Sequence, residues 1–455
     1  MTSDYAPRPH VEEPSWLRIA TLAAVLSTLL LLPFLVLDRG WVPADDALRH
    51  VAKAVSGRSW HDVLVIRPDV TIDQHPGWHA ILAFVHRSFG FAPGGLVGFS
   101  VVFMAVLVMT APIPGLRHRE SWLGAMAIAS VAEPSMVTRL FLGRPYLVSV
   151  AVLLYLLATW RRLLQPKAGR LYLWSLVVGI AAATWIHGSP FLWAIPLLAF
   201  VLSAPTRVVL RVSVAMALGV TLGAIATGDP WQFLVQTLMH ALRAVGTDVP
   251  EWMLVGEFKS STGSPLLVVA IALCTLFLER RPRTGGDARP ITILNDPVWS
   301  LAAIGWVLGL SSMRFWFDWG LPAAVLGLAS TIDRWLDQDN MTPFRRVSLT
   351  VAICLALVFA VGKDRGRRWS NERWRTYARV FDPRQSEWLP GTGGILYNSE
   401  MNAFYLGFYS RPTAPYRFLL GFEPTLLPPD ELRTVYRIQR EGASDHGCHR
   451  KTDWH

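Results

Sequence analysis

The sequence predicts an all-α protein that crosses a membrane many times. Of its 455 residues, 52% are hydrophobic and only 17% are charged, whereas soluble domains carry about 25% charged residues. The apolar residues also form long blocks, and a helix needs roughly 20 of them to cross a bilayer. The net charge of +10 does not indicate nucleic-acid binding, because Arg and Lys lie in short segments between the apolar blocks, as membrane orientation requires.

Eleven apolar blocks are candidate spans. We interpret the first as a retained helix rather than a signal peptide, because no small-residue cleavage site follows it. Several blocks are short for a full crossing, so we expect tilted helices or buried irregular ends. The blocks are 17–37, 93–112, 121–135, 145–160, 171–187, 190–203, 208–226, 265–279, 297–312, 318–333 and 347–362.

The basic residues predict the orientation of these spans. With the N-terminus in the cytoplasm, every inner segment carries at least two Arg or Lys residues, as the positive-inside rule requires. This threading places the first loop, 38–92, and the polar tail from 363 onward on the outer side. Arg outnumbers Lys, which favours a prokaryotic source and therefore the cytoplasmic (inner) membrane of a prokaryote.

The chain is thus expected to have two parts. Residues 1–362 form the membrane domain, and residues 363–455 form a small extracytoplasmic α/β domain with an extracytoplasmic C-terminus. In the second part, 393–398, 403–410 and 416–421 are predicted to be short strands. A helix with acidic residues in its first turn is expected over 428–439.

The first outer loop is patterned like a helix that lies flat on the membrane. Residues 44–60 place apolar residues at helical spacing on one face and Arg49, His50 and Lys53 on the other, which is typical of an interfacial helix. A second amphipathic stretch within 227–264 predicts another interfacial helix or a lid, with His240 and Arg243 as candidate substrate contacts.

Asp45 and Asp46 occupy the first turn of the helix expected over 44–60. A carboxylate is favourable there because it meets the helix dipole and unpaired N–H groups. One of the two is explained as an N-cap, but a pair exceeds what a cap needs. Further along the loop, His75 and His79 lie four residues apart, so they can share a helix face. They are candidate substrate-binding residues, and interfacial hydrogen-bonding histidines are the alternative.

Together these features resemble the GT-C superfamily of membrane glycosyltransferases. The resemblance rests on a first helix, a long outer loop with an acidic pair, flat helices, and the stretch "QHPGWHAIL", which is similar to the region that carries "KPP"-type motifs in some members. It implies transfer of a sugar from a polyprenyl-phosphate donor at the outer face. It also implies that Asp45 and Asp46 contribute to the active site.

Basic residues at the outer ends of other spans would bind the donor phosphate. Arg139, Arg144 and Arg314 lie at such ends, and the planar guanidinium matches phosphate oxygens. His187, beside Gly188, is a candidate for binding phosphate or a sugar hydroxyl. Structural roles remain the alternatives, because such Arg side chains also reach lipid headgroups.

The leading hypothesis is an inverting glycosyltransferase in which Asp45 or Asp46 is the general base. The other carboxylate would orient the acceptor or hold a divalent cation such as Mg²⁺ or Mn²⁺, since hard cations prefer oxygen ligands. The acceptor, whether glycan, lipid or protein, stays open. The alternatives are a transporter or flippase of a lipid-linked or anionic solute, and a glycan polymerase or ligase. A transporter usually carries ionisable residues near the bilayer midplane, and the middles of these spans hold almost none.

Overall fold

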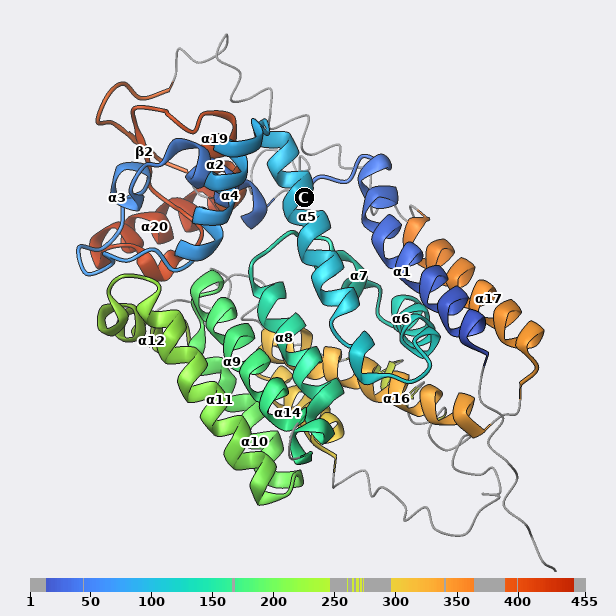
Figure 1. Ribbon diagram of the computed structural model, residues 1–455. Helices are drawn as coiled ribbons and strands as arrows, with labels where there is room; N and C mark the ends of the chain where they lie inside the picture. Colours follow the sequence, from blue (N-terminus) through green and yellow to red (C-terminus); the bar gives the residue numbers. More distant parts are fainter. Residues whose placement is uncertain are drawn as a thin grey trace, which may run out of the picture.

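The computed structural model is mostly helical (Figure 1). It describes residues 14–43, 45–165, 168–245, 260, 264, 265, 267–269, 271, 273, 296–338, 341–363, 389–398 and 400–445. Seven helical segments within these residues are long and apolar enough to cross a membrane. The protein is therefore a membrane-embedded helical protein, as the sequence predicts.

Seven predicted spans coincide with these seven segments. The corresponding helices are α1 (Ser15–Asp38), α5 (Pro93–Thr110), α8 (Tyr146–Thr159), α9 (Ala168–Ile186), α11 (Thr206–Ile225), α16 (Leu321–Gln338) and α17 (Pro343–Gly362). Three further blocks form the shorter helices α6 (Glu120–Ala132), α10 (Ala194–Ser203) and α14 (Pro297–Gly309). The block 265–279 lies largely outside the described residues.

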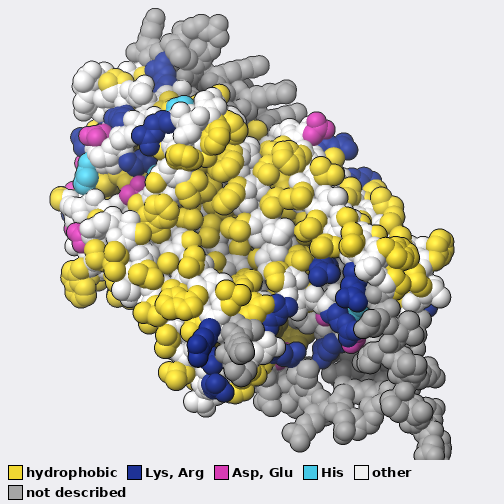
Figure 2. All heavy atoms as spheres, viewed as in Figure 1, with side chains coloured by type: hydrophobic (Ala, Val, Ile, Leu, Met, Phe, Trp, Pro, Cys, Tyr) yellow, Lys and Arg dark blue, Asp and Glu magenta, His cyan; other side chains and the backbone are white. Residues whose placement is uncertain are grey.

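The helices pack side by side in a bundle. Helix α9 packs on α11, α6 and α1 pack on α17, and α14 packs on α10 and α16. Small residues allow the closest approach: a Cβ at Gly219 of α11 would lie 2.7 Å from Cβ of Ile180 on α9. Such small-residue contacts are typical of membrane helices. In Figure 2, hydrophobic side chains cover most of the visible face, and charged side chains gather towards its two ends.

One end of the bundle carries a layer built from two distant parts of the chain, which we call the end layer (residues 41–75 and 389–445). Its first part contains α2 (Asp46–Ser56) and α3 (Trp60–Val63), and α4 (Pro76–Phe89) follows it. Its second part contains β1 (Ile395–Leu396), α19 (Met401–Ser410), β2 (Arg417–Phe418) and α20 (Pro429–Asp445). Strands β1 and β2 pair in parallel, and α19 packs against α2 (Figure 1).

Two expectations about this layer are wrong. Residues 403–410 form helix α19 rather than a strand, because Phe404 and Phe408, one helical turn apart, stack at 5.7 Å and are both buried. Helix α2 forms as predicted, but two of the three residues on its polar face are buried, and Lys53 is half-buried. Arg49 is 5% exposed and His50 is fully buried, so these two side chains point into the protein.

Candidate functional site

A polar pocket lies where the end layer meets the ends of the bundle helices. Its volume is about 940 Å³, part of which is open to solvent, and it receives residues from α2, the starts of α4 and α8, the turn after α9, and α12 (Pro230–Val245). Its charged residues are Asp46, Arg49, Arg144, Arg314 and Glu423. Its histidines are His50, His75, His187 and His240.

The acidic pair is held by arginines. Arg49 Nε donates to Asp46 Oδ1 at 2.7 Å, and Arg144 Nη2 donates to Asp45 Oδ2 at 2.9 Å. Arg144 Nε also lies 3.6 Å from Asp46 Oδ2. Asp45 occupies the N-cap position of α2 but makes no side-chain cap hydrogen bond, so capping does not explain either carboxylate. Asp46 lines the pocket, whereas Asp45 is not among the lining residues.

Asp46 is ionised at physiological pH. Burial by itself would raise the pKa of its carboxyl group, but the charges of Arg49 and Arg144 and the hydrogen bond from Arg49 outweigh burial and hold that pKa well below its usual range. The pocket therefore presents a fixed carboxylate beside two fixed guanidinium groups.

Arg314 lines the pocket from the short helix α15 (Met313–Phe315). Its Nε lies 3.3 Å from Oδ2 of the buried Asp318, and its Nη2 lies 3.3 Å from His187 Nε2. His187 Nδ1 in turn lies 3.0 Å from the Ser149 hydroxyl. Asp318 belongs to a π-helical turn, η7 (Trp316–Gly320), and such turns often occur at functional sites.

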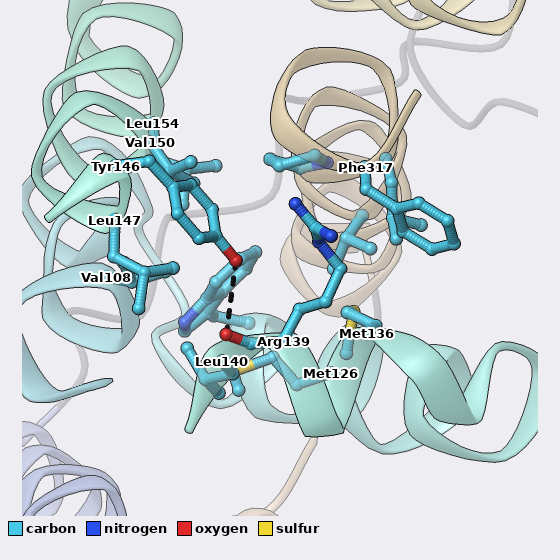
Figure 3. A pocket seen from close by; sticks show the side chains of 14 residues that line it. Val108, Met126, Met136, Arg139, Leu140, Tyr146, Leu147, Val150, Leu154 and Phe317 are labelled. Carbon is cyan, nitrogen blue, oxygen red and sulfur yellow. Dashed lines mark hydrogen bonds between the residues drawn. The ribbon is translucent and has the colours of Figure 1, made fainter. Parts of the chain in front are cut away.

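Arg139 lies elsewhere, beside a second, apolar cavity of about 530 Å³ (Figure 3). Its Nη2 donates to Asp318 Oδ1 at 2.6 Å. In Figure 3 the Tyr146 hydroxyl donates to the Arg139 carbonyl, a contact of 3.2 Å. Tyr146 lines both the apolar cavity and the polar pocket, so the two spaces share a wall.

His75 and His187 form a neutral stacked pair in the pocket. Their ring planes differ by 5° and their centroids lie 5.8 Å apart. Burial, with further contributions from Arg49 and His79, lowers the pKa of His75 to about 3. Burial and the charge of Arg314 also hold the pKa of His187 well below its usual value. Both rings therefore act as neutral hydrogen-bonding groups.

His79 does not line the pocket. It stands behind His50: His79 Nε2 lies 2.8 Å from His50 Nδ1, and His79 Nδ1 lies 2.5 Å from Asp73 Oδ2. Sequence spacing linked His79 with His75, but the contact that fixes His79 comes from Asp73, six residues earlier. Helical spacing could not predict the contact between Asp73 and His79, because Asp73 precedes α4.

Helix α12 forms where the sequence predicts an interfacial helix or lid, and it contacts the end layer. Gln236 bonds the backbone of Ile72 in both directions, and His240 pairs with Glu423 at the pocket. Arg243 pairs with Asp69 instead of lining the pocket.

Five of the eight predicted site residues line the polar pocket, namely Asp46, Arg144, Arg314, His75 and His187. The other three lie outside it: Asp45 pairs with Arg144, His79 contacts His50, and Arg139 lines the apolar cavity. Sequence reasoning placed Arg49 and His50 on the polar face of an interfacial helix without assigning them to the site, and it missed Glu423 and Asp73. Among the described residues, no group of three or more His, Cys, Asp or Glu side chains could hold a metal ion.

No protein-family model matches this chain, and no curated protein is significantly similar to it.

Proposed function

We propose that this protein is a membrane glycosyltransferase of the GT-C type. It takes a sugar from a polyprenyl-phosphate donor and transfers it, with inversion, to an acceptor hydroxyl at the extracytoplasmic face. The N-terminus would lie in the cytoplasm of a prokaryotic cell and the end layer outside its inner membrane. The observation that carries the proposal is a pocket at one end of a membrane bundle that is lined by three arginines and by the carboxylates of Asp46 and Glu423.

The arginines suit a lipid-linked phosphate. Arg144 and Arg314 are oriented by Asp45 and Asp318, and a guanidinium has five N–H donors, more than one carboxylate can accept. When the bond between the sugar and the phosphate breaks, its electron pair stays on the phosphate oxygen. Fixed donors at that oxygen stabilise the charge that develops there.

The apolar cavity suits the lipid part of the donor. Its walls are Val108, Met126, Leu147 and other apolar side chains (Figure 3). Because Tyr146 borders both spaces, a phosphate in the polar pocket would place the first units of its chain near this cavity. Burial of each CH₂ group there would contribute about 0.8 kcal/mol.

Asp46 is the proposed general base. The acceptor oxygen forms the new bond to the anomeric carbon, and its proton passes to the Asp46 carboxylate. An ionised carboxylate that lines the pocket can accept that proton when the acceptor hydroxyl lies within hydrogen-bond reach.

The test is sugar transfer from a polyprenyl-phosphate donor in membranes that contain the wild type, Asp46→Asn, Asp45→Asn or Asp38→Asn. We expect Asp46→Asn to lower kcat by about 10²–10⁴-fold, the usual contribution of a general base. Asp38 is an exposed carboxylate at the end of α1, so Asp38→Asn is the matched control and should be fully active. Full activity of both Asp45→Asn and Asp46→Asn would overturn the mechanism.

A further inference from the structure

Another charged pocket lies at the end of the bundle opposite the end layer, and we call it the far pocket. Its volume is about 820 Å³, part of which is open to solvent. Helix α8 connects the two sites: Tyr146 at its start lines the polar pocket, and Leu157 near its end lines the far pocket. A rise of about 1.5 Å per residue places them about 16 Å apart along the helix. The charged and aromatic residues that line the far pocket are Trp160, Arg161, Asp296, Trp299, Asp333 and Arg334.

Two walls of the far pocket are joined through α16. The backbone N–H of His118, in the segment after η1 (Ile113–Gly115), donates to Asp333 Oδ1 at 2.6 Å. On the same helix, Gly327 permits a close approach to α14, because a Cβ there would lie 2.8 Å from the Trp299 ring. Helix α16 therefore holds both α14 and the segment after η1 in place.

The other walls are joined at the end of α8. Gly115 of η1 packs directly on this end, because a Cβ at Gly115 would collide with the Ala158 carbonyl oxygen. The next element, η2 (Trp160–Leu164), reaches α14, since Arg161 Nη2 donates to Asp296 Oδ2 at 3.1 Å. Together the four contacts close a ring around the space, so the far pocket is built into the fold.

The charges of the far pocket are arranged in depth. The Arg161 side chain is 56% exposed and that of its partner Asp296 only 13%. Likewise, Arg334 is exposed and Asp333 is half-buried. The guanidinium groups therefore lie nearer the mouth and the carboxyl groups deeper. A nucleotide, which carries several negative charges and no positive one, would meet as many carboxyl as guanidinium groups here. The arrangement instead favours a ligand with one cationic and one anionic group, whose cationic end enters first.

The position of the far pocket suits the headgroup of a phospholipid. It lies at the ends of α8 and α16, which belong to segments long and apolar enough to cross a membrane. Trp160 and Trp299 line it, and tryptophan is enriched at the depth of lipid headgroups. In a zwitterionic phospholipid the ammonium is the tip of the headgroup, and the phosphate lies between it and the acyl chains. Such a headgroup can enter tip first while its acyl chains stay in the bilayer.

We propose that the far pocket binds a zwitterionic phospholipid whose headgroup carries a primary ammonium, as in phosphatidylethanolamine. The carboxyl groups of Asp296 and Asp333 accept hydrogen bonds from the ammonium, and Arg161 and Arg334 donate to the phosphate oxygens. A choline headgroup has no N–H to donate to the carboxyl groups, so it binds more weakly. The bound headgroup joins η2, α14 and α16 at the end of the bundle away from the polar pocket.

The first test compares lipids on the wild-type protein in detergent by native mass spectrometry. The probes are phosphatidylethanolamine, phosphatidylcholine and phosphatidylglycerol with the same acyl chains, and soluble phosphoethanolamine as a competitor. We expect a Kd for phosphatidylethanolamine at least about tenfold lower than for the other two lipids, the usual effect of one hydrogen bond to a charged group. Equal Kd values for the three lipids, or tightest binding of the anionic phosphatidylglycerol, would overturn the proposal. Displacement by phosphoethanolamine at the concentrations at which the lipid binds would overturn the assignment to a lipid.

Three variants locate the binding. Asp296 is the N-cap of α14, and asparagine caps a helix as well as aspartate does, so Asp296→Asn removes the charge and keeps the cap. This variant should lose the preference for phosphatidylethanolamine over phosphatidylcholine, whereas Arg334→Gln should weaken binding of both lipids about tenfold. Arg207→Gln, which changes an exposed arginine at the start of α11 outside the pocket, is the matched control and should bind like the wild type.

The variants also show whether the lipid binds elsewhere on the protein. If Asp296→Asn keeps the preference, or Arg334→Gln keeps the wild-type Kd, the far pocket is not the binding site. None of these measurements uses sugar transfer, so their result stands whether or not the proposed function is correct.

Discussion

At the scale of single residues, the pocket combines fixed charges with neutral imidazoles. Asp46 stays ionised because Arg49 and Arg144 contact it, whereas His75 and His187 stay neutral because burial disfavours the imidazolium form. Asp46, His75 and His187 therefore keep one pattern of charge across physiological pH.

The neutral histidines predict acid lability. The folded protein holds the pKa of His75 at about 3, below the 6.5 of an unperturbed imidazole. Between these values the unfolded chain binds a proton that the folded protein does not, so stability is full above about pH 6.5 and falls as the pH drops, by up to about 1.4 kcal/mol per pH unit per histidine. The Tm in detergent should therefore decrease from pH 7 towards pH 4.

His75→Gln should flatten part of this decrease, because the glutamine does not titrate. The variant His86→Gln, which changes a half-buried histidine outside the pocket, should keep the wild-type slope. An identical slope of Tm against pH in His75→Gln and the wild type would contradict the role of the buried imidazole.

Some site residues could be predicted from sequence because each follows or precedes an apolar block. Arg144, Arg314 and His187 were found in this way. Asp318 and Asp73 could not be assigned roles, since their partners lie on other segments of the chain. Arg49 and His50 were placed correctly on a helix face, but the sequence did not show that this face would be covered.

At the scale of elements, two glycines allow the start of α4 to pack closely against the end of α9. A Cβ at Gly188 would lie 2.1 Å from the Gln74 carbonyl oxygen, and a Cβ at Gly77 would lie 2.5 Å from the Trp185 ring. This close approach brings His75 against His187. Only residues without a side chain permit it.

Gly188→Ala should therefore destabilise the protein by about 1–3 kcal/mol, the usual cost of overpacking, and separate the stacked histidines. The measurements are Tm and sugar transfer, and both should decrease. Gly391→Ala is the control, since a Cβ there would meet nothing within 4 Å. If Gly188→Ala matched the wild type in both measurements, the close contact would have no structural importance.

The elements that sequence predicts best are those set by local pattern. Apolar blocks placed the seven long helices, and helical spacing placed α2 and α12. The stretch 403–410 was predicted to be a strand because aromatic residues favour strands. Packing of Phe404 against Phe418, at 5.4 Å between ring centroids, belongs to the tertiary structure and outweighs that preference.

At the scale of the whole molecule, the pocket exists because the two parts of the end layer, which are distant in sequence, meet. The Val65 N–H donates to the Phe418 carbonyl at 3.0 Å, and Leu64 forms a bridge with Phe418. Glu423 then reaches the pocket beside α12. From the sequence, residues 363–455 were predicted to form a small domain of their own. The pairing with the first loop could not be predicted, because a contact across more than 350 residues leaves no local pattern.

The central claim is that the polar pocket holds the phosphate of a polyprenyl-linked donor. The most direct test is an experimental structure of the wild-type protein in lipid nanodiscs with added polyprenyl phosphate. The account predicts phosphate density between Arg144 and Arg314, with the first units of the chain beside Tyr146 and the apolar cavity. Phosphate density at any other place on the protein, with the polar pocket empty, would contradict it.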